Sequence, residues 1–198
     1  MARNAENGDG RRGSQWRIAG WAVVTILLLL ALLVAMQFSE EWNWDLFDFI
    51  FAFVVLFGAG LTYELVARKA DTIAYKAGVG VAVAAALLLV WINTAVGIIG
   101  DDEAINLIYF GVLVIGMIGV LIARFEPQGM ARAAFAMAIA QMLVPVIALT
   151  IPDLRGALME PPGVLGVFGL NAFFAALFAG SAWLFWIAAR GEPEQGAA

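Results

Sequence analysis

The sequence predicts an all-α membrane protein: a polytopic helical bundle of six transmembrane helices with both termini in the cytoplasm. Three observations support this fold class. Hydrophobic residues make up 63% of the 198-residue chain and charged residues only 14%, whereas a soluble domain is about 45 to 50% apolar. The apolar residues gather in six runs, each near the roughly 20 residues that cross a bilayer. The basic residues fall almost entirely on one side of these runs.

The first element is a polar tail followed by an apolar run. Residues 1–15 are rich in Gly and Arg, so we expect a disordered cytoplasmic tail. The run 18–38 follows basic residues, as a signal peptide does, but it is longer than the about 7 to 15 apolar residues of a signal peptide and no Ala-x-Ala site follows it. We therefore expect an uncleaved helix, which is either a separate anchor or a member of the bundle.

The later elements are five further apolar runs. They cover residues 46–67, 77–99, 106–123, 133–151 and 165–189. Each predicts a helix, because a lipid-exposed backbone is satisfied only in a helix or a closed barrel, and no segments of polar and apolar alternation suggest barrel strands. Together the six helices make one predicted domain over residues 16–190, and residues 191–198 form a second cytoplasmic tail.

The loop charges determine the predicted orientation. All Lys and Arg residues except Arg155 lie before the first helix, after the second and fourth helices, or at the end of the sixth. Basic loops stay in the cytoplasm, so both termini are expected there. The opposite loops carry the acidic residues Glu40, Glu41, Asp45, Asp101, Asp102, Glu103, Asp153 and Glu160.

Composition also excludes several kinds of chemistry. The net charge of -5 and the lack of a large basic cluster argue against a nucleic-acid partner. The chain contains no Cys and no His, which removes thiol catalysis, disulfides and every imidazole base or ligand. We expect no metal, no cofactor and no enzymatic activity, and the expected partner is the lipid bilayer.

A few polar residues lie within the apolar runs. An amide in hydrocarbon without a partner costs several kcal/mol, so Asn93 must face protein or water. It either joins helices or lines a site. Asn171 is expected at a similar depth, and Pro145 frees the carbonyl of Gln141. The candidate polar pocket, in the outer half of the bilayer, consists of Asn93, Thr94, Gln141, Pro145 and Asn171.

The charged residues near helix ends have structural explanations. Asp48 lies in the first turn of its helix, where a carboxylate suits the helix dipole, so a capping role is expected. Glu64 precedes Arg68 by four residues, the spacing of an ion pair on one helix face. The alternative is that Asp48 or Glu64 titrates in a proton-transfer step, although neither lies at the bilayer midplane.

Glycine-rich and alanine-rich patches predict close helix packing. They are Gly58-Ala59-Gly60, Gly116-Met117-Ile118-Gly119 and the series Ala172, Ala176 and Gly180. Because such surfaces are abundant and catalytic groups are not, the expected function is an accessory or interaction subunit of a membrane complex, or a homo-oligomer. The alternative is a small transporter or channel for a neutral or zwitterionic solute that uses the candidate pocket.

Four segments carry a resemblance to other proteins: Leu61–Lys69, Val90–Gly100, Asn106–Tyr109 and Ile122–Arg132. With these segments the chain resembles a family of small uncharacterised bacterial multi-pass membrane proteins, over residues 42–190. The resemblance implies a bacterial protein of the inner membrane and transfers no activity. Members of the family often begin near the second helix, which implies that helix 18–38 is an added anchor.

Overall fold

The computed structural model describes residues 2–38, 44–95, 97–99, 106–159 and 161–191, leaving aside the side chains of residues 2–14 and 153. Over this part of the chain the protein is all-helical and has no strand. The acidic loop residues Glu40, Glu41, Asp101, Asp102, Glu103 and Glu160 lie outside the described residues, as does the predicted tail after Gly191.

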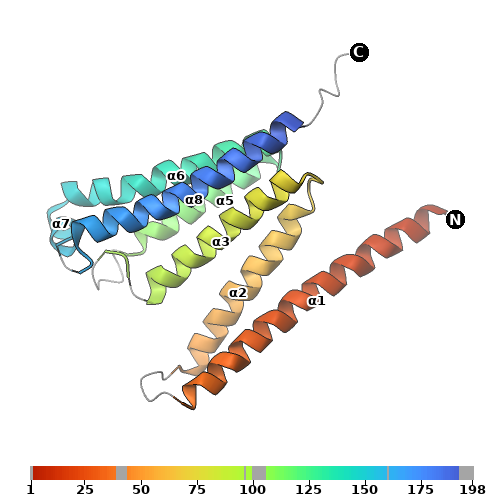
Figure 1. Cartoon of the computed structure of the whole chain (residues 1–198), viewed down its shortest axis with the longest axis horizontal. Helices are drawn as coiled ribbons and strands as arrows, with labels where there is room; N and C mark the ends of the chain where they lie inside the picture. Colours follow the sequence, from red (N-terminus) through yellow and green to blue (C-terminus); the bar gives the residue numbers. More distant parts are fainter. Residues whose placement is uncertain (1, 39–43, 96, 100–105, 160, 192–198) are drawn as a thin grey trace. The chain divides into compact units, whose positions relative to one another are not determined.

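The helices are arranged in two compact units (Figure 1). Their order is α1 (Ala2–Met36), α2 (Leu46–Ala67), α3 (Ile73–Ala95), α5 (Ile108–Ala123), α6 (Pro127–Thr150), α7 (Pro152–Ala157) and α8 (Gly163–Gly191). One unit is Met1–Leu65 and the other is Val66–Ala198, whereas the sequence predicted one domain over residues 16–190.

Five described helices are long and apolar enough to cross a membrane. They are residues Gln15–Met36 of α1, and α2, α3, α6 and α8. The helix α5 has 16 residues and is apolar throughout, but it is shorter than the other five. The membrane class predicted from composition is thus supported by helices of the required length.

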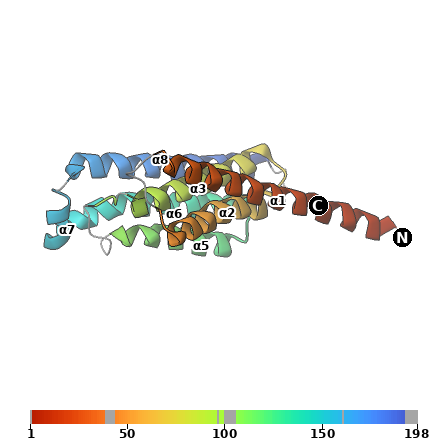
Figure 2. The ribbon, with the colours of Figure 1, turned by 90° about the horizontal axis from the view of Figure 1, so that it is seen from below.

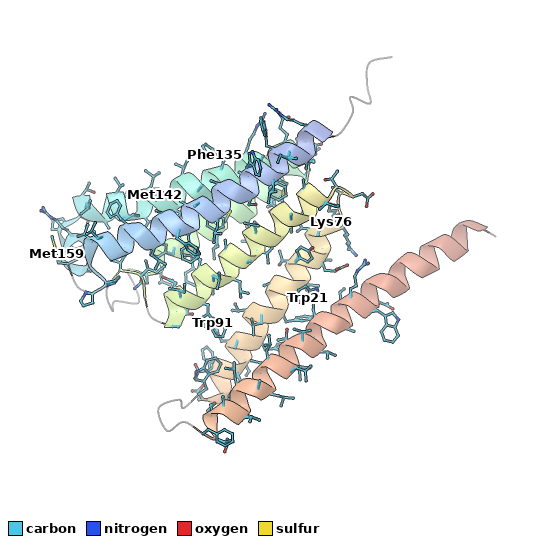
Figure 3. The ribbon with its side chains drawn as sticks, viewed as in Figure 1. Trp21, Lys76, Trp91, Phe135, Met142 and Met159 are labelled. Carbon is cyan, nitrogen blue, oxygen red and sulfur yellow. The ribbon has the colours of Figure 1, made fainter. Side chains whose placement is uncertain are left out.

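The Met1–Leu65 unit contains α1 and most of α2. Trp21 projects from α1 toward α2 (Figure 3), where its indole lies edge-on to Tyr63 with ring centroids 6.3 Å apart. A Cβ added to Gly60 would lie 2.6 Å from the indole, so the glycine makes room for this contact. The helix α1 begins at Ala2, and residues 2–15, predicted to be a disordered tail, are helical. Extending an existing helix adds about one hydrogen bond per residue, so α1 can continue into a polar segment. The amino-acid composition of the tail does not show this effect.

The Val66–Ala198 unit is a bundle in which α6 and α8 lie side by side. The helix α3 packs on α8, and α5 packs on α6 (Figures 1 and 2). The short helix α7 lies at the end where α6 stops and α8 begins. Buried aliphatic and aromatic side chains fill the space between the helices, among them Leu89, Val112, Val144, Phe174 and Phe178.

Two helix ends and one short helix differ from the prediction for identifiable reasons. The helix α3 was predicted to run to Ile99 but ends at Ala95, and Gly97 then adopts a left-handed φ of 74°. The helix α6 begins at Pro127 instead of Ala133, because proline is favoured in a first helical turn, where its missing N–H costs nothing. The helix α7 was not predicted, since six residues show no apolar periodicity.

The helices α5 and α6 form a tight hairpin. Arg124 and Phe125 both have positive φ values, 51° and 66°, which turn the chain within a few residues. The N–H of Glu126 donates to the carbonyl of Ala123 over 2.9 Å. Farther along the two helices, a Cβ added to Gly119 would lie 2.6 Å from that of Ala133. The small side chains therefore bring the two backbones close together.

The end of this unit that holds the α5–α6 turn also holds the start of α3 and the end of α8. The Tyr75 hydroxyl donates to the carbonyl of Phe125 over 2.8 Å, and the Tyr75 ring is 5.1 Å from that of Phe185. We call this the basic end, because its charged residues include Arg68, Lys69, Lys76, Arg124, Arg132 and Arg190. Figure 3 shows Lys76 here and Met159 at the opposite end.

Candidate functional site

The first polar cluster of the Val66–Ala198 unit is built around Asn106, and we call it the Asn106 joint. The Asn106 side-chain oxygen accepts hydrogen bonds from the backbone N–H groups of Ile98 and Ile99, over 2.8 and 3.0 Å. Its amide nitrogen donates to the carbonyl of Ile99 over 3.3 Å. One side chain thus satisfies the backbone of the segment after α3, which explains why the chain can leave the helix while remaining buried.

Asn93 belongs to the same joint. Its amide nitrogen donates to the backbone carbonyl of Asn106 over 3.0 Å, and both residues are buried. The contact links the last turn of α3 to the residues just before α5. The Asn93 side-chain oxygen is buried without a hydrogen-bond partner. The observed contact of Asn93 is a joining one, and a role in lining a site stays a prediction.

The second cluster, the Asn171 centre, joins three helices. The Gln141 amide of α6 donates to the Asn171 oxygen of α8 over 3.0 Å. The Asn171 amide nitrogen donates to the Tyr109 hydroxyl of α5 over 2.9 Å and to the carbonyl of Val167 over 2.8 Å. The carbonyl of Val167 can only accept, so the Asn171 side-chain atom that faces it must be the amide nitrogen. The Asn171 oxygen is then the atom that accepts from Gln141.

The Asn171 centre is closed to water. Gln141 and Asn171 have an exposed fraction of 0%, and Tyr109 has 1%. A side chain with no accessible area touches no space that a water molecule could enter. The Gln141 side-chain oxygen also lacks a partner. This arrangement can hold three helices in register, but it offers a solute no surface.

Among the five residues of the candidate pocket, a hydrogen bond joins Gln141 to Asn171, whereas Asn93 bonds to Asn106. Thr94 is exposed, and its hydroxyl donates to the carbonyl of Val90 in its own helix over 2.9 Å. Pro145 is buried inside α6.

The charged candidates lie at helix ends. Asp45 and Asp48 form a reciprocal cap at the start of α2: the Asp45 N–H donates to the Asp48 carboxylate over 2.9 Å, and the Asp48 N–H donates to that of Asp45 over 3.0 Å. Glu64 accepts from the Arg17 guanidinium over 2.7 Å. The sequence proposed Arg68 as the partner of Glu64, and that pairing stays a prediction beside the observed one.

Sequence reasoning missed Asn106, Tyr109 and Arg17. Asn106 and Tyr109 lie at the start of an apolar run, where a polar residue is usually explained by the membrane interface. Both belong to the segment Asn106–Tyr109 of the family resemblance, and this was the sequence signal that could have marked them as candidate site residues. Arg17 is 47 residues from Glu64 in the chain, and a spacing rule finds partners only within one helix.

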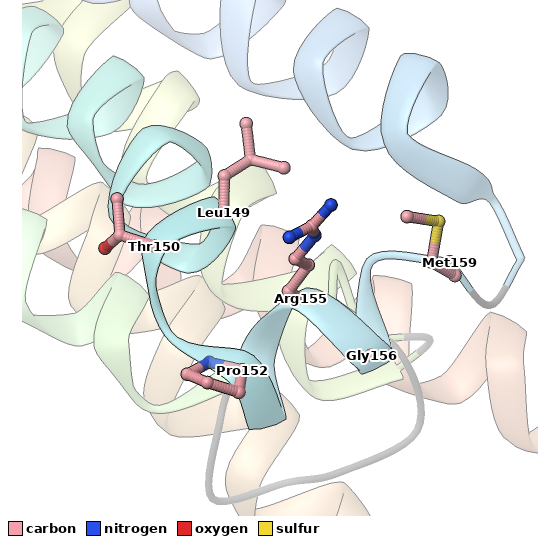
Figure 4. Close-up of a pocket in the computed structure, with 6 residues that line it drawn as sticks. All are labelled: Leu149, Thr150, Pro152, Arg155, Gly156 and Met159. Atoms are coloured by element: carbon pink, nitrogen blue, oxygen red, sulfur yellow. The ribbon is translucent and has the colours of Figure 1, made fainter.

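A surface groove lies between the end of α6 and α7 (Figure 4). Its volume is about 370 Å³, and we call it the Arg155 groove. None of the candidate-pocket amides lines it. Its lining residues are Leu149, Thr150, Pro152, Arg155, Gly156 and Met159.

Comparison with protein-family models, with characterised proteins and with solved structures finds no match for this chain. The resemblance to small bacterial multi-pass membrane proteins therefore stays a prediction. Fold and site geometry, without a relative, carry the functional argument. Over the described residues the protein is all-helical, with several membrane-length helices and two buried polar clusters.

Proposed function

We propose that the protein is a six-span membrane protein of a bacterial inner membrane, with both termini in the cytoplasm. The helix α5 supplies the sixth span. In support, hydrogen bonds and ring contacts gather the basic residues of the Val66–Ala198 unit at one end, apart from Arg155. Basic residues at one end of a bundle are typical of the cytoplasmic side.

Within that membrane, the protein serves as an accessory or interaction subunit of a complex, or assembles with copies of itself. The observation that carries this proposal is a face of α8. Gly169, Ala172 and Ala176 are exposed, Gly180 is half-exposed, and a Cβ added to either glycine would meet no atom within 4 Å. These four residues, the α8 small-residue face, recur at helical spacing, and such spacing suits close approach by another helix.

The other two small-residue patches support the same role by contrast. The Trp21 indole occupies the space beside Gly60, and Ala133 occupies the space beside Gly119. Each of these two glycines therefore already has a neighbour within the chain. The α8 small-residue face has open space at both of its glycines and exposed alanines, so we assign it to a partner. The first partner to test is α8 of a second copy, because the same small residues on both helices would allow their backbones to approach.

The closed Asn171 centre also favours interaction over transport. A transporter for a neutral or zwitterionic solute would need Asn93 and Asn171 to reach water. With Asn171 fully buried and hydrogen-bonded, its polar groups are used within the bundle. The transport alternative predicts that cysteines placed at positions 93 and 171 react with a membrane-impermeant thiol reagent, and the interaction role predicts that both are protected.

The assembly can be tested by counting chains in particles cut directly from the membrane with a lipid-retaining polymer. We expect more than one copy of the chain, or one copy with a second protein in fixed ratio. Replacing Ala176 by Leu should reduce the assembly to single chains, because the added side chain separates the helices. The matched control, Ala136→Leu on the exposed surface of α6, should leave it intact. Wild-type particles that hold one chain and no fixed partner would contradict the proposal.

The orientation is tested separately. The chain has no native Cys, so single cysteines at positions 69 and 102 can be labelled in intact cells. We expect an impermeant reagent to label position 102 and to reach position 69 only after the membrane is opened. The reverse pattern would overturn the assigned orientation and leave the assembly result unaffected.

A further inference from the structure

The Arg155 groove owes its shape to the break between α6 and α7. The helix α6 ends at Thr150, and the N–H of Arg155 donates to the carbonyl of Ile151 over 2.8 Å as α7 begins its short turn. Leu158 is fully buried and Leu154 packs against the core, so this side of the segment is anchored. Arg155 and Met159 lie on its other side, and both are exposed.

The lining of the groove combines one cation with apolar surface. The apolar surface of the groove comes from Leu149, Pro152 and Met159. Figure 4 shows the Arg155 guanidinium between Leu149 and Met159. The Thr150 hydroxyl donates to the carbonyl of Ile147 over 2.7 Å, so toward the groove it can only accept. The donors that a ligand would meet are therefore the guanidinium N–H groups, whose planar arrangement suits the oxygens of a phosphate.

Among the described side chains, Arg155 has no ion pair. In a protein that spans a membrane, the groove also has a defined depth. The 24-residue helix α6 is about 36 Å long, longer than the roughly 30 Å hydrocarbon core, so its end lies at the level of the lipid headgroups. Exposed Val146 and Ile147 continue the apolar surface from the groove into the membrane.

We propose that the Arg155 groove binds one phospholipid, with the phosphate on the Arg155 guanidinium and the acyl chains along Leu149 and the exposed face of α6. This site rests on membrane insertion and is independent of the proposed assembly.

The test measures lipid retention by the intact chain, using native mass spectrometry of detergent-solubilised protein with added phosphatidylethanolamine. We expect Arg155→Gln to weaken binding of one lipid molecule by roughly tenfold, the loss expected for a charge-assisted contact. Met159→Gln should weaken it less, since it removes apolar contact and keeps the cation. The matched control is Arg190→Gln at the basic end, which removes the same charge from another interface and should retain that lipid.

A further arm separates a bound lipid from its phosphate headgroup alone. Glycerophosphoethanolamine, the headgroup without acyl chains, should fail to displace the lipid at equal concentration. If it competes equally, or if Arg155→Gln retains as much lipid as the wild type, the groove is not a lipid site. Equal lipid loss in Arg155→Gln and Arg190→Gln would likewise contradict a site at Arg155.

Discussion

The Met1–Leu65 unit and the Val66–Ala198 unit satisfy their buried polar groups with different chemistry. In the first, a charged pair, Arg17 and Glu64, lies close to the end of α2, where the Arg17 side chain is 60% exposed and the Glu64 side chain 9% exposed. In the second, neutral amides and a phenol meet in the interior, where Asn171 and Gln141 have no exposed surface. Moving a charge out of water costs far more than moving an amide, so the buried Glu64 carboxylate is paired with a cation that water can reach, whereas amides serve at depth.

This difference leads to different expectations for mutation. The exposed Arg17 guanidinium is accessible to water and salt, which weaken its contact with Glu64 and can solvate it again once Glu64 is replaced. A closed amide cluster has no such alternative, because each lost partner leaves a buried group unsatisfied. Substitutions in the Val66–Ala198 unit should therefore be the more destabilising ones.

The largest effect is expected for Asn106→Ala. The substitution removes the acceptor of two buried backbone N–H groups, those of Ile98 and Ile99, and should lower the free energy of unfolding by about 2 to 4 kcal/mol. The measurement is a detergent-titration unfolding curve of the reconstituted protein. Thr94→Ala, on the exposed side of the same region, is the control and should change little. A loss for Asn106→Ala no greater than that of the control would mean that the joint does not hold the segment.

Asn171→Ala should come next, with a loss of about 1 to 3 kcal/mol in the same titration. It removes three hydrogen bonds and leaves Gln141 and Tyr109 without their partner. The double variant Gln141→Leu with Asn171→Leu should cost less than the sum of its single substitutions, because both partners leave together. Strict additivity would show that the two amides are not coupled.

Glu64→Gln should have a smaller effect, about 0.5 to 1 kcal/mol, because Arg17 is largely exposed. The loss should shrink at high salt, which screens an exposed pair. A double-mutant cycle with Arg17→Gln measures the coupling directly. A coupling energy as large as that of the Asn171 centre, or one that salt does not change, would break the contrast between the two units.

The smallest effect is expected for Asp48→Ala, which removes half of the reciprocal cap at the start of α2. Such caps contribute about 0.5 to 1 kcal/mol. Asp71→Ala is the control, since it removes a carboxylate that lies outside the helices. Equal losses for the two variants in the unfolding titration would indicate a general charge effect instead of a cap.

The sequence predicted the elements that hydropathy and local capping determine. The bounds of α2 agree at both ends, because an acidic cap precedes its apolar run and Arg68 follows it. Hydropathy does not locate the end of α3, since Ile98 and Ile99 are as apolar as the helix before them. Their conformation depends on the Asn106 amide, a contact made across the fold.

The candidate site was predictable to a similar degree. The chemistry of buried amides singled out Gln141 and Asn171, and these two do meet. Sequence could not assign Tyr109 as the further partner of Asn171, because a tyrosine near the start of an apolar run also suits the membrane surface. It grouped Asn93 with them by depth alone, whereas side chains at equal depth can face different neighbours.

The tight α5–α6 hairpin has a consequence for biosynthesis. The helix α5 is about 24 Å long, shorter than the hydrocarbon core of a typical bilayer, so alone it is a poor span. The helix α6 follows after only the Arg124–Glu126 turn, and the two helices pack closely where Gly119 meets Ala133. We expect the translocation machinery to release α5 into lipid only once α6 has emerged, so that the two enter the bilayer as one folded pair.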